Sequence, residues 1–116
     1  MKKIKSALIS LSDKSHLKTI LKVLKKNKIK LISSGGTYKT IKRLKFECLE
    51  VSDFTGFDEV LDGRVKTLHP KIYAGILNKR KNKVHTKEMK LKNFENIDLV
   101  IVNFYPFEKT IKKTKN

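Results

Sequence analysis

Short apolar runs alternate along this chain with stretches in which apolar residues recur at helical spacing. The runs cover residues 4–11, 29–32, 46–51 and 97–102. Apolar runs of this length, and the alternation of apolar and polar residues in the third, are typical of strands in a sheet. The last run is the clearest, because Asp98 alone interrupts it.

Helices are predicted between these strands. The first places lysines opposite an apolar face, with Ser12 or Asp13 as its N-cap, and its apolar positions are Leu17, Ile20, Leu21 and Leu24. Gly35 opens the second helix, Pro70 lies in the first turn of the third, and residues 82–94 form the fourth. Strands that alternate with helices imply right-handed crossovers and a parallel sheet. We therefore predict one domain over residues 1–116, a three-layer α/β fold whose mostly parallel sheet has helices on both faces.

A polar loop follows each predicted strand. The four loops cover residues 10–14, 33–37, 52–57 and 103–107. Ligands of open parallel sheets bind outside the carboxyl ends of the strands. We therefore expect these loops to meet at one edge of the sheet and to form a site there.

The net charge of the 116-residue chain is +17. A basic domain favours phosphate-bearing partners, including nucleic acids. Among its 28 basic residues, however, only Arg43, Arg64 and Arg80 are arginine, and the lysines are spread along the chain. Lysine lacks the bidentate fork with which arginine reads guanine, so a solvated lysine-rich surface explains the charge better. The same charge attracts anionic metabolites.

Composition excludes several classes of protein. Cys48 is the single cysteine, which rules out an internal disulfide and a cysteine-built zinc site, and we interpret it as a buried strand residue. His16 and His85 are interpreted as surface residues, and with His69 they lack the spacing of a metal site. No apolar run approaches the roughly 18 residues of a membrane span, and the short apolar stretch after Met1 does not fit a signal peptide. We expect a cytoplasmic protein with no membrane partner.

Residues 33–37, with the sequence SSGGT, are the first candidate for chemistry. Glycines let the backbone approach a phosphate closely, and the N-terminus of the following helix offers N–H groups and partial positive charge. An ordinary tight turn capped by Thr37 is the alternative. Lys14 favours phosphate binding, because a lysine at the start of the neighbouring helix opposes the helix dipole unless an anion is present.

The segment 62–70 is the second candidate. In extended backbone Arg64 and Lys66 point to the same side, and two converging cations suit an anion or a developing oxyanion. A solvated loop is the alternative. We interpret His69, which precedes a proline, as hydrogen-bonding its own loop rather than as an acid or base. Tyr105 follows the predicted strand 97–102. Its hydroxyl reaching a ligand is one interpretation, and its ring packing in the core is the alternative.

Six short motifs give the chain a resemblance to a known family. In chain order they read SLSDK, SGGT, SDFTGF, GRVKTLHP, GIL and NFYPF, and they begin at residues 10, 34, 52, 63, 75 and 103. Their order and spacing resemble the inosine monophosphate (IMP) cyclohydrolase domain of the bifunctional purine biosynthesis proteins. The resemblance extends over about residues 4–110.

The resemblance implies a methylglyoxal-synthase-like fold and the last step of purine synthesis, the closure of FAICAR to IMP with loss of water. It implies a small-molecule nucleotide substrate, with no metal and no organic cofactor. The residues that it assigns to substrate binding are Ser10, Ser12, Lys14, Ser34, Gly35, Gly36, Thr37, Arg64, Lys66, Thr67 and Asn103. Those from 12 to 37 are expected at the 5′-phosphate, and the later ones at the ribose and base. The catalytic residues that it implies are Arg64, Lys66 and Tyr105, with Lys66 and Tyr105 stabilising charge on the formyl and carboxamide oxygens.

The chain also departs from the family pattern. In the family, the cyclohydrolase domain continues beyond the NFYPF motif with a catalytic aspartate and a lysine, and a transformylase domain follows. Because this sequence stops at Asn116, we expect an N-terminal piece that keeps phosphate binding but has weak or absent turnover. The resemblance also suggests a homodimer.

Two other functions stay open. A methylglyoxal synthase or a regulatory phosphate-binding domain shares the fold, with Asp53 or Asp62 as the carboxylate base in the synthase. The other is a lysine-rich nucleic-acid-binding module, which lacks stacking aromatics and a recognised binding motif. We therefore expect no nucleic-acid partner.

Overall fold

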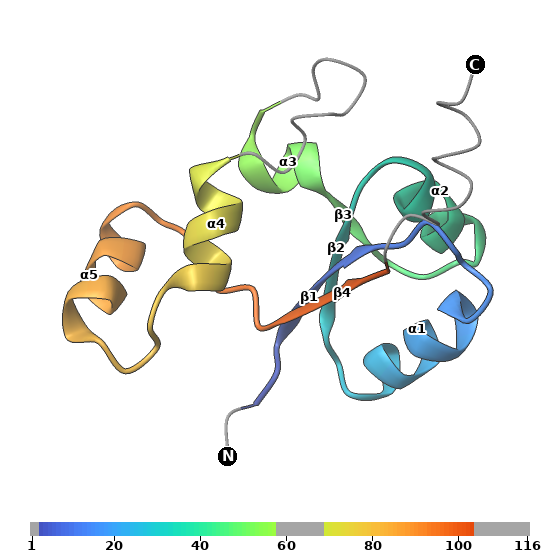
Figure 1. The fold of residues 1–116 in the computed structure, drawn as a ribbon, viewed down its shortest axis with the longest axis horizontal. Helices are drawn as coiled ribbons and strands as arrows, with labels where there is room; N and C mark the ends of the chain where they lie inside the picture. Colours follow the sequence, from blue (N-terminus) through green and yellow to red (C-terminus); the bar gives the residue numbers. More distant parts are fainter. Residues whose placement is uncertain (1–2, 58–68, 104–116) are drawn as a thin grey trace, which may run out of the picture.

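The computed structural model describes residues 3–57 and 69–103. Within these residues, four strands form one sheet in which every neighbouring pair is parallel. The strands are β1 (Ser6–Ser10), β2 (Lys30–Ser33), β3 (Leu49–Glu50) and β4 (Leu99–Val102), in the order β3-β2-β1-β4 (Figure 1). Leu8 of β1 lies in register between Ile32 of β2 and Val100 of β4. The predicted parallel sheet is confirmed.

Helices pack on both faces of the sheet (Figure 1). α1 (Leu17–Lys26) and α2 (Gly35–Arg43) cover one face, and α3 (Val51–Thr55) and α4 (Pro70–Leu77) cover the other. α5 (Lys83–Leu91) lies farther out, beyond α4. This arrangement is the predicted three-layer α/β fold. No helix in the described part of the chain is long and apolar enough to cross a membrane.

The larger apolar cluster joins α1 and α2 to the sheet. Successive side chains of a strand point to opposite faces, so Ala7 and Ile9 belong to this cluster whereas Leu8 belongs to the other. The apolar face of α1 is buried here as predicted, through Leu17, Leu21 and Leu24. Full burial of one such leucine contributes about 1.5–3 kcal/mol.

The smaller apolar cluster joins α3 and α4 to the opposite face. Its helical members, Val51, Phe54 and Ile72, meet three residues of the sheet and the chain that enters it, namely Leu8, Ile32 and Ile97. Lys71 Nζ lies 4.7 Å from the centroid of the Phe54 ring, a cation–π contact between α4 and α3. Both helices are thus packed on the side of the sheet away from α1.

The predicted strand over 46–51 is wrong for most of its length. Only Leu49 and Glu50 pair with β2, and the chain enters α3 at Val51. The helix forms because Val51 and Phe54, three residues apart, both reach the apolar cluster, while Asp53 suits the positive end of the helix. Gly56, with φ 73°, ends it in the left-handed conformation. The segment predicted as a polar loop at 52–57 is therefore mostly helical.

The predicted N-cap of α1 is also wrong. The helix begins after His16, whereas Ser12 and Asp13 precede it by a full turn. Asp13 Oδ1 accepts the Ser15 N–H at 2.9 Å, the side-chain bond that Asp makes two residues on in a turn. The chain therefore turns once more before the helix starts.

The starts of α4 and α5 follow the predicted signals. Pro70 occupies the first turn of α4, and His69 caps it because Nδ1 accepts the Lys71 N–H at 3.0 Å. His69 thus hydrogen-bonds locally, as predicted. Asn82 caps α5 by accepting two backbone N–H groups, those of Val84 and His85.

Some interpretations near α5 need correction. The helix ends at Leu91 instead of residue 94, because Asn93 adopts the left-handed conformation with φ 56°. His85 is half-buried, and its Nδ1 accepts the Lys79 N–H at 2.9 Å, so it ties the α4–α5 connection rather than lying free on the surface. Asp98 lies just before β4, outside the strand.

Candidate functional site

The carboxyl ends of three strands bring polar segments together at one edge of the sheet. β1 ends at Ser10, β2 at Ser33 and β4 at Val102, which Asn103 follows. Hydrogen bonds join the segment after β1 to both of the others. The predicted convergence is therefore confirmed for the segments 10–14 and 33–37 and for Asn103.

Asn103 fixes the segment after β1. Its Oδ1 accepts both the backbone N–H and the hydroxyl of Ser12, at 2.7 and 2.8 Å. Its Nδ2 donates to the carbonyl of Asp13 at 3.0 Å. The carboxamide thus acts as a bridge between β4 and the β1–α1 loop, which gives a predicted substrate-binding residue a structural contact at the same time.

Thr37 fixes the same segment from the other side. Its hydroxyl oxygen accepts the Leu11 N–H and donates to the Leu11 carbonyl, both at 3.1 Å, and the side chain is buried. In the neighbouring strand, the Ser33 hydroxyl donates to the Ile9 carbonyl at 2.6 Å. These bonds hold the first turn of α2 against the end of β1. The hydroxyl of Thr37 is therefore hydrogen-bonded to the backbone of Leu11.

The N-terminus of α2 has the features of an anion cradle. Ser34 is the N-cap residue, in extended backbone, and its side chain makes no capping hydrogen bond. Gly35 has φ 58°, a conformation that glycine adopts without strain. A Cβ on Gly36 would lie 3.7 Å from Lys14 Nζ. The ammonium group therefore lies over the positive end of α2, a position that an anion between them stabilises.

The residues that border the segment 58–68 lie close together. The ring centroids of Phe57, after α3, and His69, before α4, are 6.2 Å apart. Thr55 Oγ1 accepts the Phe57 N–H at 3.1 Å and shapes the chain where it leaves α3. Four of the predicted site residues, Arg64, Lys66, Thr67 and Tyr105, lie outside the described residues.

Other titratable groups add little to the site. Asp53 lies exposed in α3. Within residues 3–57 and 69–103, no group of three or more His, Cys, Asp or Glu side chains has the arrangement of a metal site. Cys48 is half-buried just before β3, where burial raises the pKa of its thiol to about 11, partly opposed by Lys42. The basic and hydroxyl side chains at the carboxyl edge therefore remain the candidates.

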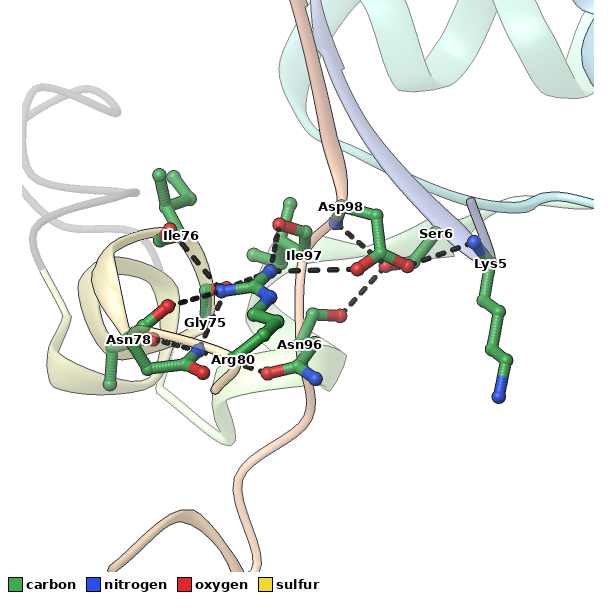
Figure 2. Close-up of polar contacts among 10 residues, drawn as sticks. Lys5, Ser6, Gly75, Ile76, Asn78, Arg80, Asn96, Ile97 and Asp98 are labelled. Atoms are coloured by element: carbon green, nitrogen blue, oxygen red, sulfur yellow. Dashed lines mark hydrogen bonds and ion pairs between the residues drawn. The ribbon is translucent and has the colours of Figure 1, made fainter. Parts of the chain in front are cut away.

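Sequence analysis missed a second polar cluster, at the amino ends of β1 and β4 (Figure 2). Arg80 lies at its centre, bonded to backbone carbonyls and paired with Asp98. Two signals pointed to it in the sequence. Asp98 interrupts the strongest apolar run, and Arg80 is one of three arginines in a chain of lysines.

Comparison with known proteins gives the family. A profile of the MGS-like domain matches residues 16–116. The bifunctional purine biosynthesis protein PurH of Acetivibrio thermocellus is 50% identical over 110 residues, which are 95% of this chain and 21% of that protein. The PurH of Buchnera aphidicola subsp. Schizaphis graminum is 55% identical over 106 residues, 91% of this chain and 20% of that protein. The chain thus spans about a fifth of the length of these relatives.

A solved structure agrees with the sequence comparison. The crystal structure of ForH matches with a TM-score of 0.79 at 26% identity, over 96% of this chain and 61% of that chain. The fold and its carboxyl edge define an MGS-like domain, and this chain belongs to that family. Its curated relatives named above are purine biosynthesis proteins, which confirms the resemblance given by the motifs.

Proposed function

We propose that the chain binds the nucleotide IMP and its precursor FAICAR at the carboxyl edge of the sheet, as part of an IMP cyclohydrolase site. The observation that carries the proposal is the junction of the β1–α1 loop, the N-terminus of α2 and Asn103 at that edge. The similarity to the PurH proteins supports a purine nucleotide as the ligand.

The described residues support binding of the nucleotide 5′-phosphate at the N-terminus of α2. The first N–H groups of a helix have no partner within the helix, and at α2 the side chain of Ser34 does not cap them. Lys14 lies beside Gly36 over the same turn. A nucleotide 5′-phosphate at this turn accepts hydrogen bonds from the backbone and neutralises the ammonium group.

The residues proposed at the reacting groups of FAICAR are assigned by the resemblance to the family motifs. In FAICAR the carboxamide nitrogen attacks the formyl carbon and forms the new C–N bond, after which the carbinolamine loses its hydroxyl group and a proton as water. Both reacting groups belong to one molecule, so a site that holds the phosphate and the ring in place supplies much of the rate enhancement. By resemblance, Lys66 and Tyr105 stabilise the oxygens, with Arg64, Thr67 and Asn103 at the ribose and base.

An NMR titration with IMP at near-physiological salt tests the binding proposal. Saturable shifts are expected at residues 34–37 and at Asn103. Lys14→Met is expected to raise the Kd about tenfold, since a charge-assisted bond to phosphate is lost. Lys18→Met, a matched change on the exposed side of α1, is expected to leave it unchanged.

Two results contradict the binding proposal. One is the absence of saturable shifts with IMP in the wild-type chain. The other is an equal loss of affinity for IMP in Lys14→Met and Lys18→Met. In that case IMP is attracted by the overall positive charge of the chain and not by a site at Lys14. A short oligonucleotide in a parallel titration identifies the nucleic-acid alternative, because its binding weakens steeply with salt.

Ring closure is tested separately, by the absorbance change as FAICAR becomes IMP. We expect slow turnover that falls further in Lys66→Met. An unchanged rate in that variant would remove Lys66 from the mechanism, while the binding proposal would stand on the titration.

A further inference from the structure

The loop between β1 and α1 is held at its start by side chains from two other elements. The Thr37 hydroxyl of α2 bonds both the N–H and the carbonyl of Leu11. The Asn103 carboxamide, directly after β4, accepts the N–H and the hydroxyl of Ser12 and donates to the carbonyl of Asp13. Three successive residues of the loop are therefore fixed by groups that lie far away in the sequence.

The sheet register brings Asn103 to this loop. Val102, the last residue of β4, lies opposite Ser10, the last residue of β1. The two strands are parallel, so the residue after β4 leaves the sheet beside the first residues of the loop. A carboxamide can accept two hydrogen bonds and donate two, and the three bonds of Asn103 with the loop leave one N–H for another partner. The side chain is thus committed mainly to the protein.

Lys14 is the next residue of the loop. Its carbonyl accepts the Leu17 N–H at 3.1 Å, and Asp13 Oδ1 accepts the Ser15 N–H at 2.9 Å, so the backbone is also held on the side towards α1. Lys14 is half-buried although its neighbours in the loop are exposed. Its side chain lies over the first turn of α2, where a Cβ on Gly36 would be 3.7 Å from Nζ and 3.9 Å from Cε.

Holding this backbone in place favours binding of an anion by the ammonium group. Ordering the backbone of one residue costs about 1–2 kcal/mol, and a lysine side chain carries roughly 2 kcal/mol of rotamer entropy. Where the loop is already ordered in the free protein, binding bears less of this cost, and affinity rises accordingly. The bonds of Asn103 order the two residues that precede Lys14.

We infer that Asn103 is a positioning residue that acts through Lys14. By holding residues 12 and 13, its carboxamide keeps the ammonium group over the N-terminus of α2, where that group strengthens binding of a phosphate. The inference rests on the proposed function, in which the phosphate binds at this turn. Aspartate cannot replace the asparagine, because it has no donor for the Asp13 carbonyl, and leucine has neither donor nor acceptor.

A double-mutant cycle with inorganic phosphate tests the inference, because this ion carries no ribose or base for Asn103 to bind. The Kd is measured for wild type, Asn103→Ala, Lys14→Met and the double variant. We expect Asn103→Ala to raise the Kd about fivefold, which is most of the roughly tenfold rise expected for Lys14→Met. In the Lys14→Met background the same change is expected to alter the Kd less than about twofold, because the residue through which Asn103 acts is absent.

Asn27→Ala is the matched control. The Asn27 carboxamide is exposed at the C-terminal end of α1, where it donates to the Val23 carbonyl at 2.8 Å. The cradle lies at the other end of that helix, beyond the loop that carries Lys14. Removal of the Asn27 carboxamide is therefore expected to leave the Kd of phosphate unchanged.

Three results overturn the inference. An equal rise of the Kd in both backgrounds means that Asn103 acts on the phosphate directly. A loss of thermal stability with an unchanged Kd of the folded protein means that its role is only structural. Equal weakening in Asn103→Ala and Asn27→Ala means that the effect is not particular to this carboxamide.

A second variant covers the case in which Asn103→Ala does not fold. Asn103→Gln keeps the same groups and adds no charge, but its side chain is one methylene longer, so the three bonds cannot all form with the present backbone. We expect a smaller rise of the Kd that again disappears in the Lys14→Met background. A rise that persists there overturns the inference.

A measurement without ligand separates this inference from the proposed function. In NMR spectra, Asn103→Ala is expected to shift the Gly36 N–H resonance and the ε-methylene resonances of Lys14, and Asn27→Ala is expected to leave them unchanged. Unshifted resonances overturn the positioning role. If they shift but wild type binds neither phosphate nor IMP, the proposed function fails while the coupling from Asn103 to Lys14 stands.

Discussion

The two ends of the sheet use similar side chains for different purposes. At the amino edge, Arg80 donates hydrogen bonds to backbone carbonyls and pairs with Asp98. Asn78 donates to the Ala74 carbonyl and to the side chain of Asn96. At the carboxyl edge, Thr37 and Asn103 also bond the protein, but the first turn of α2 receives no cap from Ser34.

This difference teaches how to recognise a binding edge in a chain rich in lysine. A buried basic group whose donors are met by carbonyls and a carboxylate is part of the architecture. An ammonium group placed over the positive end of a helix lacks that internal compensation and suits an external anion. By this criterion Lys14 and α2 form the proposed binding end, whereas Arg80 belongs to the architecture.

The largest effect is expected from Gly75→Ala at the amino edge. The added Cβ would lie 2.8 Å from the Glu95 carbonyl oxygen and 3.1 Å from Ile97 Cγ1, so α4 or the chain before β4 must move. We expect a loss of roughly 3 kcal/mol in the free energy of unfolding. Urea denaturation measures it.

Gly36→Ala is the matched change at the carboxyl edge. There the nearest atoms belong to the flexible side chain of Lys14, the closest at 3.7 Å. Alanine is favoured over glycine in a helix, so stability is expected to rise by roughly 0.5 kcal/mol, whereas affinity for ribose 5-phosphate falls because the methyl group enters the cradle. Similar stability changes in the two variants would contradict the contrast between the edges.

A smaller loss of stability is expected from Thr37→Val. The change removes the hydroxyl that accepts the Leu11 N–H and donates to the Leu11 carbonyl, and both residues are buried. An unpaired buried N–H group costs about 1–3 kcal/mol. The control is Thr40→Val, because the Thr40 hydroxyl bonds only the Gly36 carbonyl of its own helix at an exposed position.

Thermal denaturation of both variants decides the role of Thr37. If Thr37→Val is as stable as Thr40→Val, the hydroxyl is not needed to join α2 to β1. It then becomes available to a phosphate, as the family resemblance implies.

Much of the fold was predictable because its main signals are local. Leu17, Leu21 and Leu24 recur at helical spacing, and a run such as 97–102 has few ways to be buried except in a sheet. Pro70 marks the start of α4 because proline has no backbone N–H to leave unpaired in the first turn. Asn82 marks the start of α5 because its side chain accepts the first free N–H groups of that helix. The convergence of the polar segments 10–14 and 33–37 and of Asn103 followed from topology, since parallel strands end at one edge.

What failed to follow from the sequence depends on tertiary contacts. Val51 and Phe54 were interpreted as strand and loop, because a five-residue helix has too short a pattern and owes its existence to the apolar cluster beneath it. Apart from Asp98, the partners of Arg80 are backbone carbonyls, which carry no sequence signal. The resemblance assigned Thr37 to phosphate binding. The hydrogen bonds of its hydroxyl with the Leu11 backbone depend on the packing of α2 beside β1, which the sequence does not show.

The smallest effect concerns Cys48, which lies just before β3 at the amino side of the sheet. Burial raises the pKa of its thiol from 9.0 to about 11, opposed by Lys42 and aided by Glu50. The thiolate fraction at pH 8 is therefore about a hundredfold lower than in the unfolded chain, but a more basic thiolate is also more nucleophilic. We expect alkylation by iodoacetamide to be roughly tenfold slower in the folded protein than in urea.

The pH dependence gives the sharper test of this amino-side environment. The folded state holds the thiol proton more tightly than the unfolded state does, so the contribution of Cys48 to stability is fully present below pH 9 and is lost as the pH rises towards about 11. Cys48→Ser removes this dependence, and denaturation of the two proteins at pH 8 and pH 10.5 isolates it.

In the alkylation experiment, equal rates in the folded and unfolded protein would show that water reaches Cys48 freely. The part of the amino side next to β3 would then be less enclosed than the packing of Cys48 against the larger apolar cluster indicates, and the contrast with the carboxyl edge would rest on the contacts of α4 alone.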